Sequence, residues 1–227
     1  MSERLTALRD QIAQTCARVQ RDPDGVALLP VSKTFSAENI RQAQALGFTR
    51  FGENRMQEVR EKAEQMEGDA PQWVVIGHVQ TNKARDVVRH AAELQTLDRL
   101  DLAQALDRRL QSEGRKLDVL VQVKTAAEQA KHGLPPEDLE AFLCDMTAFE
   151  TLRICGFMTV ATQSDDAAVV RACFARLRTL RDQALSQGLV SQDAQRLSMG
   201  MSGDFQIAIE EGATDIRIGS ALFGSRA

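Results

Sequence analysis

Two lysines of this 227-residue chain stand directly after apolar runs, where strands of a folded protein would end. Lys33 follows the run 26–32, and Lys124 follows the run 117–123. An amine carried to the rim of an apolar core is partly desolvated, and desolvation favours its neutral form. The neutral amine is the form that condenses with an aldehyde to an imine. A lysine that only extends into solvent is the alternative, and position alone does not decide between the two residues.

Two turns rich in glycine and serine lie near the end of the sequence. Residues 198–203, SMGMSG, lead into a helical stretch, and Gly219 with Ser220 follows the run 214–218. Backbone amides at a helix start and serine hydroxyls together form a site for an anion. Glycines that only allow tight turns are the alternative, but the pairing of two such turns favours a phosphate site.

Three further polar residues have a chemical and a structural interpretation. Arg217 lies between Ile216 and Ile218, so alternation along a strand places it on the opposite face. If that face is the protein interior, the guanidinium needs either a carboxylate in an ion pair or an acceptor on a bound ligand. Asn54 either caps the helical stretch after it or lines the same rim. His78 is either a ligand contact or a hydrogen-bonding loop residue, and the second is favoured.

The elements that must position these residues alternate along the chain between apolar and helical segments. Short apolar or β-branched runs predict eight strands, at 26–31, 49–51, 73–76, 94–97, 117–123, 153–157, 196–198 and 214–218. Helical spacing of apolar residues predicts a leading helix before Pro23 and seven more, at 37–46, 55–65, 82–92, 100–111, 136–149, 166–187 and 205–211. Such alternation requires right-handed crossovers and a parallel sheet covered by helices.

Eight strand–helix units favour an α/β fold of the closed (β/α)8, TIM-type barrel with a leading N-terminal helix. A doubly wound open sheet would usually have about six strands and a glycine-rich turn after the first. No linker divides the sequence, so we expect a single barrel domain over residues 1–227. Functional residues of barrels lie at the C-terminal strand ends, and phosphate is commonly bound after strands seven and eight, where the two serine turns fall.

Composition and spacing exclude several classes of function. The chain has 28 basic and 32 acidic residues, a net charge of −4, which argues against a nucleic-acid-binding surface. No apolar run approaches the about 20 residues of a membrane span, and the first residues lack the apolar core of a secretion signal, so we expect a cytoplasmic protein. The four cysteines have no CxxC spacing and the three histidines no metal-ligand spacing, so we expect reduced, mostly buried cysteines and no metal.

An imine-forming lysine, a phosphate site and an arginine match the aldehyde, the phosphate and the pyridine nitrogen of pyridoxal 5′-phosphate. Several segments then make the chain recognisable, namely LLPVSKT (28–34), FGENRMQE (51–58), IGHVQTNK (76–83), AKHGLPP (130–136), GFMTVA (156–161) and SMGMSGDFQIAIEEGATDIRIGSALFG (198–224). Over essentially its whole length the chain resembles the YggS/PROSC family of pyridoxal-phosphate-binding proteins. One departure is Val74 after Trp73, where the family usually has histidine, and it leaves the local contact of that histidine open.

The resemblance implies how the cofactor pyridoxal 5′-phosphate would be held. It implies that Lys33, rather than Lys124, forms the aldimine. The other contacts that it implies are Ser202, Gly219 and Ser220 at the phosphate, Arg217 at the pyridine nitrogen, and Asn54 beside the cofactor.

The resemblance also implies a fold similar to the barrel of alanine racemase, so catalysis must be weighed. Racemases of that type move the α-proton with a lysine and a tyrosine, and this chain contains no tyrosine. Only three residues follow Gly224, so we expect no second, β-rich racemase domain. A cationic Arg217 at the pyridine nitrogen would disfavour ring protonation and weaken the cofactor as an electron sink. We therefore expect a non-catalytic binding protein in intracellular pyridoxal phosphate (vitamin B6) homeostasis.

Two other functions stay open at this point. One is a weak pyridoxal-phosphate-dependent enzyme acting on amino acids, and the other is a Schiff-base lyase of the aldolase type acting on a phosphorylated sugar. The family implies a monomer, with apo forms of pyridoxal-phosphate enzymes as possible recipients of the cofactor. Lys83 and Lys131 are candidates for assisting its release, although solvated surface lysines are the simpler interpretation.

Overall fold

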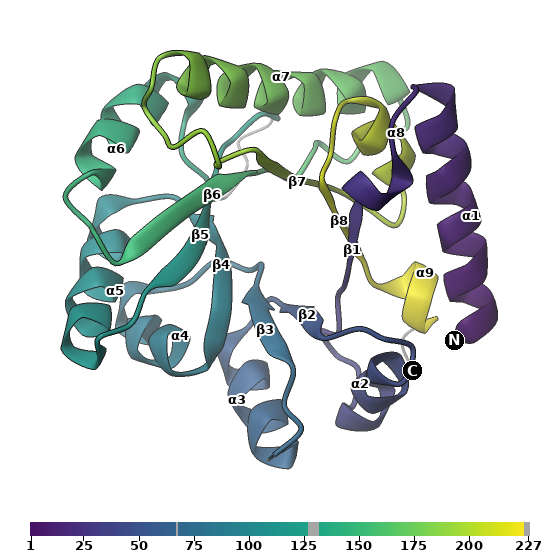
Figure 1. Cartoon of the computed structure of the whole chain (residues 1–227), viewed down its shortest axis with the longest axis horizontal. Helices are drawn as coiled ribbons and strands as arrows, with labels where there is room; N and C mark the ends of the chain where they lie inside the picture. The colour runs from purple at the N-terminus through teal and green to yellow at the C-terminus, as the bar shows by residue number, and fades with distance from the viewer. Residues whose placement is uncertain (67, 127–131, 225–227) are drawn as a thin grey trace.

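A computed structural model of the chain describes residues 1–66, 68–126 and 132–224. Within these residues, eight parallel strands form one sheet in the order β1-β8-β7-β6-β5-β4-β3-β2. A bridge between Val31 and Gly52 joins the two outermost strands, so the sheet curves into a barrel (Figure 1). The strands are β1 (Ala27–Pro30), β2 (Arg50–Glu53), β3 (Gln72–Val75), β4 (Ala91–Leu97), β5 (Leu117–Gln122), β6 (Leu152–Met158), β7 (Arg196–Met201) and β8 (Asp215–Ile218).

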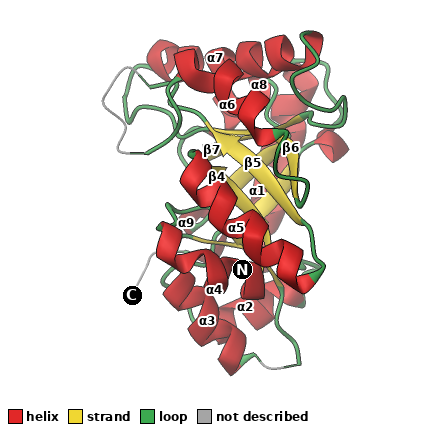
Figure 2. Ribbon diagram, turned by 90° about the vertical axis from the view of Figure 1, so that its left-hand side faces the viewer, coloured by secondary structure: helices red, strands yellow, loops and turns green. Residues whose placement is uncertain are grey.

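Helices surround the strands on the outside, as Figure 2 shows from the side. They are α1 (Ser2–Arg18), α2 (Ala37–Gln44), α3 (Met56–Gln65), α4 (Ala84–His90), α5 (Leu100–Glu113), α6 (Leu139–Met146), α7 (Ala167–Ser186), α8 (Phe205–Glu210) and α9 (Ser220–Phe223), with 3-10 turns η1 (Pro23–Gly25), η2 (Thr81–Lys83) and η3 (Pro136–Asp138). The leading helix α1 packs against α8 and α9. The predicted α/β barrel with a leading helix is confirmed.

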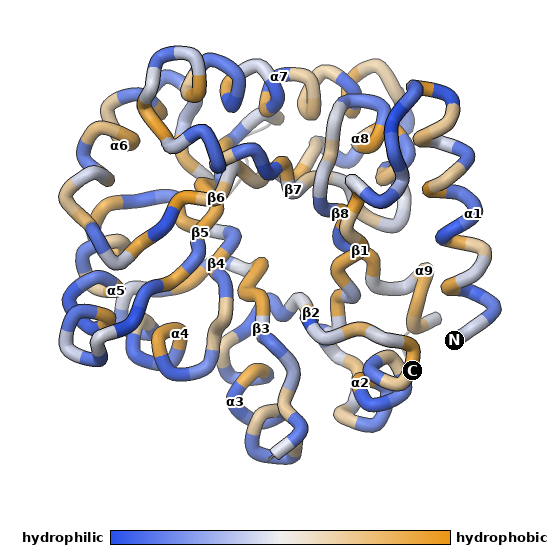
Figure 3. Tube along the Cα trace, viewed as in Figure 1, coloured by the Kyte–Doolittle hydropathy of each residue, from blue (hydrophilic) through white to orange (hydrophobic). Residues whose placement is uncertain are grey.

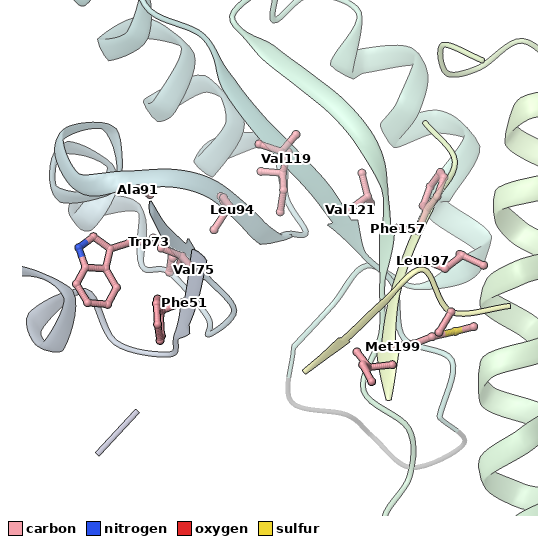
Figure 4. Close-up of a cluster of buried hydrophobic side chains, with 14 of the residues drawn as sticks. Phe51, Trp73, Val75, Ala91, Leu94, Val119, Val121, Phe157, Leu197 and Met199 are labelled. Carbon is pink, nitrogen blue, oxygen red and sulfur yellow. The ribbon is translucent and has the colours of Figure 1, made fainter. Parts of the chain in front are cut away.

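The buried side chains lie on both faces of the strands. Between sheet and helices, Phe51, Trp73 and Phe157 are almost fully buried and belong to one apolar cluster (Figure 4). Along the helices, hydrophilic and hydrophobic residues alternate, as expected where one face meets the sheet and the other meets water (Figure 3). Among the described residues, no helix has the length and apolar character that crossing a membrane would need.

Two predictions from the sequence need correction. The helix predicted over 82–92 ends at His90, and β4 already begins at Ala91, because Ala91 pairs with Trp73 in the parallel ladder. Tertiary pairing thus overrides the helical pattern of this segment. The cysteines are free, but only Cys16 and Cys173 are buried, whereas Cys144 is exposed and Cys155 is half-buried.

Candidate functional site

Four neighbouring strands, β2, β1, β8 and β7, end at one rim of the barrel, and the candidate residues follow them. The amide of Val31 donates to the carbonyl oxygen of Ile218 at 2.8 Å, which holds the end of β1 beside the end of β8. On the other side, the amide of Ser32 donates to the carbonyl oxygen of Gly52 at 3.0 Å. The segments that carry Lys33, the β2 loop and the β8 loop are therefore side by side.

Lys33 follows the end of β1 at this rim. Leu29 and Val31 face the barrel interior, because a Cβ atom added at Gly52 would lie 3.3 Å from Leu29 Cδ2 and 3.4 Å from Val31 Cγ2. Lys33 lies two residues after Val31, in the turn that follows the strand. Its side chain is half-buried, and its amine makes no hydrogen bond or ion pair within the described ranges. This amine is available for a ligand.

The backbone around Lys33 has an unusual conformation. Thr34 has a φ of 68°, which is rare for a β-branched residue. Its amide donates to Glu58 Oε2 at 2.8 Å. On the other side of the lysine, Ser32 Oγ donates to Glu53 Oε1 at 2.7 Å. Side chains of β2 and α3 therefore hold both neighbours of Lys33.

Arg217 is a buried cation in the barrel interior. It is 4% exposed and donates to Ser198 Oγ and to the carbonyl oxygen of Thr159, both at 2.8 Å. Within the described part of the chain, no carboxylate forms an ion pair with it. Burial lowers the pKa of its guanidinium to about 10, which Asp204 and Asp215 partly oppose, so it stays cationic at neutral pH. Of the two interpretations left open, the ion pair is not observed, and a ligand acceptor fits a buried cation that has only neutral partners.

The two serine turns lie at the ends of β7 and β8. Gly200 has a φ of 92°, and a Cβ atom there would lie 2.5 Å from Ala208 Cβ, so only glycine lets the β7 turn pack on α8. Ser202 in this turn is half-buried, and the Met201 amide donates to Asp204 Oδ1 at 2.5 Å. Burial raises the pKa of Asp204, although this hydrogen bond opposes the shift.

The second turn begins at Gly219, which precedes α9. Gly219 is half-buried and Ser220 is exposed. A Cβ atom on Gly219 would lie 3.5 Å from the carbonyl oxygen of Val31, so this turn lies against the segment that leads to Lys33. The two turns follow the seventh and eighth strands, as the sequence predicted. The structure adds that β8 brings the second turn beside β1.

Asn54 does not cap the following helix. The helix α3 begins at Met56 with Arg55 at its N-cap, and no side-chain hydrogen bond caps it. Asn54 Oδ1 is buried and, among the described residues, has no hydrogen-bond partner. A Cβ atom at Gly77 would lie 2.0 Å from the carbonyl oxygen of Asn54, so glycine there allows the β2 and β3 loops to meet. An unpaired buried acceptor at the rim favours the second interpretation of Asn54, a residue that lines the site.

The other candidates have structural surroundings. His78 stacks on His132 with ring centroids 3.9 Å apart, and burial lowers the pKa of His78, with the charges of His132 and Arg99 adding to the effect. Lys83 is exposed, with its amine 3.9 Å from Asp86 Oδ2. Lys131 lies outside the described residues. No group of three or more potential metal ligands occurs in the part of the chain that is described.

A chain of polar side chains that extends from Arg217, buried at Ser198, Gln95 and Glu93 and half-buried at its two arginines, was not predicted. Its members, from the rim downward, are Ser198, Gln95, Glu93, Arg196 and Arg50. Ser198 Oγ donates to Gln95 Oε1 at 2.6 Å, and Gln95 Nε2 donates to Glu93 Oε1 at 2.7 Å. Arg196 and Arg50 both donate to Glu93, at 2.7 and 2.5 Å. The polar spacing of Glu93 and Gln95, two residues apart in one strand, is the sequence signal that would have revealed it.

Comparisons with known proteins identify the family to which the chain belongs. Residues 4–227 match the family described as "Alanine racemase, N-terminal domain". A protein of Pseudomonas aeruginosa named Pyridoxal phosphate homeostasis protein is 38% identical over 229 residues, covering 98% of this chain and 97% of that one. PipY of Synechococcus elongatus PCC7942, solved without PLP, has a TM-score of 0.87 at 37% identity and covers 99% of this chain and 100% of its own.

The structure of PipY with PLP bound has a TM-score of 0.83 at 36% identity, with 94% of this chain and 100% of that chain covered. Alanine racemase of Clostridium difficile 630 has a TM-score of 0.71 at 15% identity, over 94% of this chain and 56% of that one, which is a likeness of fold alone. This chain therefore belongs to the family of pyridoxal phosphate homeostasis proteins, the YggS/PROSC family that its motifs resemble.

Proposed function

We propose that this chain binds pyridoxal 5′-phosphate at the rim formed by β7, β8, β1 and β2, and holds it as an aldimine on Lys33. The link would form between Lys33 Nζ and the aldehyde carbon, with the aldehyde oxygen leaving as water. The observation that carries the proposal is Arg217, a buried cation without a carboxylate partner among the described residues, on the strand next to the one that leads to Lys33. The PLP-bound structure of PipY, which this chain matches over that protein's full length, supports it.

The residues present fit the three groups of this cofactor. Arg217 would donate a hydrogen bond to the unprotonated pyridine nitrogen, while its contacts with Ser198 and Thr159 keep the guanidinium in place. The residues that would hold the phosphate are Ser202, Gly219 and Ser220. Asn54, whose Oδ1 is buried without a partner in the described chain, would lie beside the cofactor. The chemistry that the cofactor supplies when bound is a reactive aldehyde and a ring that can accept electrons.

We also propose that the protein holds and releases the cofactor without transforming amino acids. A cationic Arg217 at the ring nitrogen would leave that nitrogen unprotonated, and the chain contains no tyrosine to act as a second base. Relatives that it matches over nearly their whole length are named as homeostasis proteins. The proposed role is that of a monomeric cytoplasmic carrier in pyridoxal phosphate homeostasis, with apo enzymes as recipients.

Borohydride reduction tests the covalent part of this proposal. The purified protein is mixed with pyridoxal 5′-phosphate, its visible absorbance is recorded, and the reduced protein is digested and mapped. We expect one labelled peptide, carrying the label on Lys33. Labels spread over surface lysines would contradict the proposal, and trapping of a sugar phosphate in place of pyridoxal phosphate would favour the aldolase-type function.

Proton exchange tests the non-catalytic part. Amino acids are incubated in deuterated water with the loaded protein, and their α-deuterium content is followed by mass spectrometry. We expect the rate to equal that of free pyridoxal phosphate at the same concentration. Faster exchange that depends on Lys33 would instead establish a weak pyridoxal-phosphate enzyme, the alternative that the racemase-like fold raises.

A further inference from the structure

A cluster of charged side chains lies against the turn that carries Lys33 and takes no part in the proposed cofactor contacts. Lys62, on α3, donates to Glu53 Oε1 at 2.6 Å and to the carbonyl oxygen of Ser32 at 2.8 Å. It also lies 3.3 Å from Glu58 Oε2, the oxygen that accepts the Thr34 amide. Through Lys62 and Glu58, one helix contacts the backbone on both sides of the reactive lysine.

Two members of the cluster are almost inaccessible to solvent, whereas Glu58 is half-buried. Glu53 is 0% exposed and Lys62 is 7% exposed. Burying an ion pair costs desolvation free energy that its attraction often fails to recover, so such a pair is poor evidence of a role in stability. Burial accordingly raises the pKa of Glu53, although Lys62 and Ser32 oppose the shift. What the cluster does fix is geometry, since three of its hydrogen bonds converge on the Ser32–Thr34 backbone and the Ser32 hydroxyl.

The turn needs such support because it is strained. The φ of 68° at Thr34 lies in the left-handed region, which a β-branched residue adopts only under strain. Without the Glu58 carboxylate, nothing among the described residues would accept the Thr34 amide in this conformation. Relaxation of Thr34 would rotate the adjoining peptide group and turn Lys33 away from the rim.

We propose that Glu58 and Lys62 are positioning residues for Lys33. By holding the Thr34 amide and the Ser32 carbonyl oxygen, they keep the turn strained and the lysine amine directed at the cofactor. This inference rests on the proposed function, because it assigns α3 the task of presenting the lysine that carries the cofactor. It follows that the covalent hold on the cofactor depends on how firmly α3 is docked against β1 and β2.

The test is a rescue experiment in which binding of pyridoxal phosphate is titrated by the visible absorbance of its lysine adduct. We expect Glu58→Ala to weaken binding about tenfold, a change of about 1.4 kcal/mol. Thr34→Gly in the same protein should restore most of the affinity, because glycine adopts positive φ without strain. Glu64→Ala, an exposed residue on the same helix, is the matched control and should bind as the wild type does.

A second readout needs no cofactor. In the apo protein, we expect Glu58→Ala to increase amide hydrogen exchange at Thr34 and to change the rate at which an amine-reactive reagent labels Lys33. For Lys62, the variant is Glu53→Gln with Lys62→Met, since removal of Lys62 alone would leave Glu53 buried and unpaired. This double variant should fold, as judged by circular dichroism, and lose affinity as Glu58→Ala does.

The outcomes separate the two proposals. If the wild-type protein forms no adduct on Lys33, the proposed function fails before any variant is made. If the wild type forms the adduct and Glu58→Ala binds equally well with unchanged exchange at Thr34, the positioning role is overturned and the function stands. Weakened binding that Thr34→Gly does not restore would also overturn it, because the loss would then arise from something other than strain in the turn.

Discussion

The turns that carry Lys33 and Lys124 lie on opposite sides of the barrel, after β1 and β5 (Figure 1). Both lysines are half-buried at the carboxyl end of a strand. The Lys124 amide donates to the carbonyl oxygen of Leu134 at 2.9 Å. A Cβ atom added at Gly133 would lie 3.2 Å from Cγ of the Lys124 side chain. The backbone at Lys124 is thus held by a backbone hydrogen bond, and its side chain packs against Gly133. The turn at Lys33, in contrast, is strained and is held by side chains of α3.

The neighbours of the two lysines differ more than their burial does. On the side of Lys33, the β2 loop carries the buried Oδ1 of Asn54, which has no hydrogen-bond partner among the described residues. On the side of Lys124, the Thr125 and Thr159 hydroxyls form a hydrogen bond of 2.9 Å, and the Thr159 carbonyl oxygen accepts from Arg217, which reaches across from β8. The unpaired Asn54 acceptor, rather than the exposure of the lysine itself, therefore distinguishes the Lys33 side of the barrel.

Removing each lysine amine in turn tests most directly which side of the barrel binds the cofactor. We expect Lys33→Ala to abolish the borohydride-fixed label completely, and Lys124→Ala to leave it unchanged, because only the first amine faces the proposed cofactor contacts. Peptide mapping after reduction measures both. A label that persists in Lys33→Ala and disappears in Lys124→Ala would reverse the assignment of the two sides.

Removing the buried cation should have the next largest effect. We expect Arg217→Met to weaken binding of pyridoxal phosphate by about two orders of magnitude, the size typical of a lost buried charged contact. The apo variant should melt no lower than the wild type, because a buried cation whose hydrogen-bond partners among the described residues are neutral is costly in the folded state. Spectroscopic titration and thermal melting check the two parts. A large loss of stability with unchanged affinity would make Arg217 a structural residue.

Substitutions of two glycines sharpen the comparison and leave both lysines in the chain. Gly77→Ala would drive a methyl group to 2.0 Å from the carbonyl oxygen of Asn54, and it should displace the β2 loop and weaken cofactor binding about tenfold or more. Gly133 has a φ of 112°, so Gly133→Ala should destabilise the fold by about 1–3 kcal/mol. Affinity for the cofactor should be retained in Gly133→Ala. Titration with the cofactor measures the affinity of the two variants, and denaturant unfolding measures their stability. Equal losses of affinity in the two variants would show that the two sides are equivalent.

The sequence predicts the barrel well because alternation and strand spacing are local properties. The same rule places Arg217 inside, since its neighbours Ile216 and Ile218 must face the helices. The support of Lys33 could not be predicted in this way. Glu58 and Lys62 fall on the polar positions of an amphipathic helix, where charged residues usually face solvent. Their contacts with the Lys33 turn depend on how α3 packs beside β1, which no local pattern encodes.

The ambiguity of Asn54 has a similar origin. A polar residue just before a helical stretch is equally suited to capping and to lining a site, and a shift of one residue in the helix start decides between them. The observed start at Met56 makes Arg55 the N-cap and leaves Asn54 at the rim. The residues alone left open whether Asn54 caps the helix or lines the site, whereas the family resemblance implied a place beside the cofactor.

The smallest expected effect is a difference in pH dependence between the two turns. Burial alone would raise the pKa of Glu58, but the Thr34 amide and Lys62 together hold it below its ordinary value of 4.5. A carboxylate with a lowered folded-state pKa contributes stability that is present above pH 4.5 and is lost as the pH falls through the folded-state value. Amide exchange at Thr34, corrected for its intrinsic pH dependence, should therefore accelerate as the pH falls from 4.5 through the folded-state pKa of Glu58.

The Lys124 amide provides the internal control, because its acceptor is the backbone carbonyl of Leu134, which does not titrate. Its corrected exchange should stay constant over the range in which Thr34 loses protection, as long as the barrel remains folded. In Glu58→Gln, the acceptor oxygen is kept but cannot titrate, so the acid-dependent step at Thr34 should disappear. If both amides lose protection together in the wild type, the whole barrel is opening at acid pH, and the Lys33 turn has no local link to the charge of Glu58.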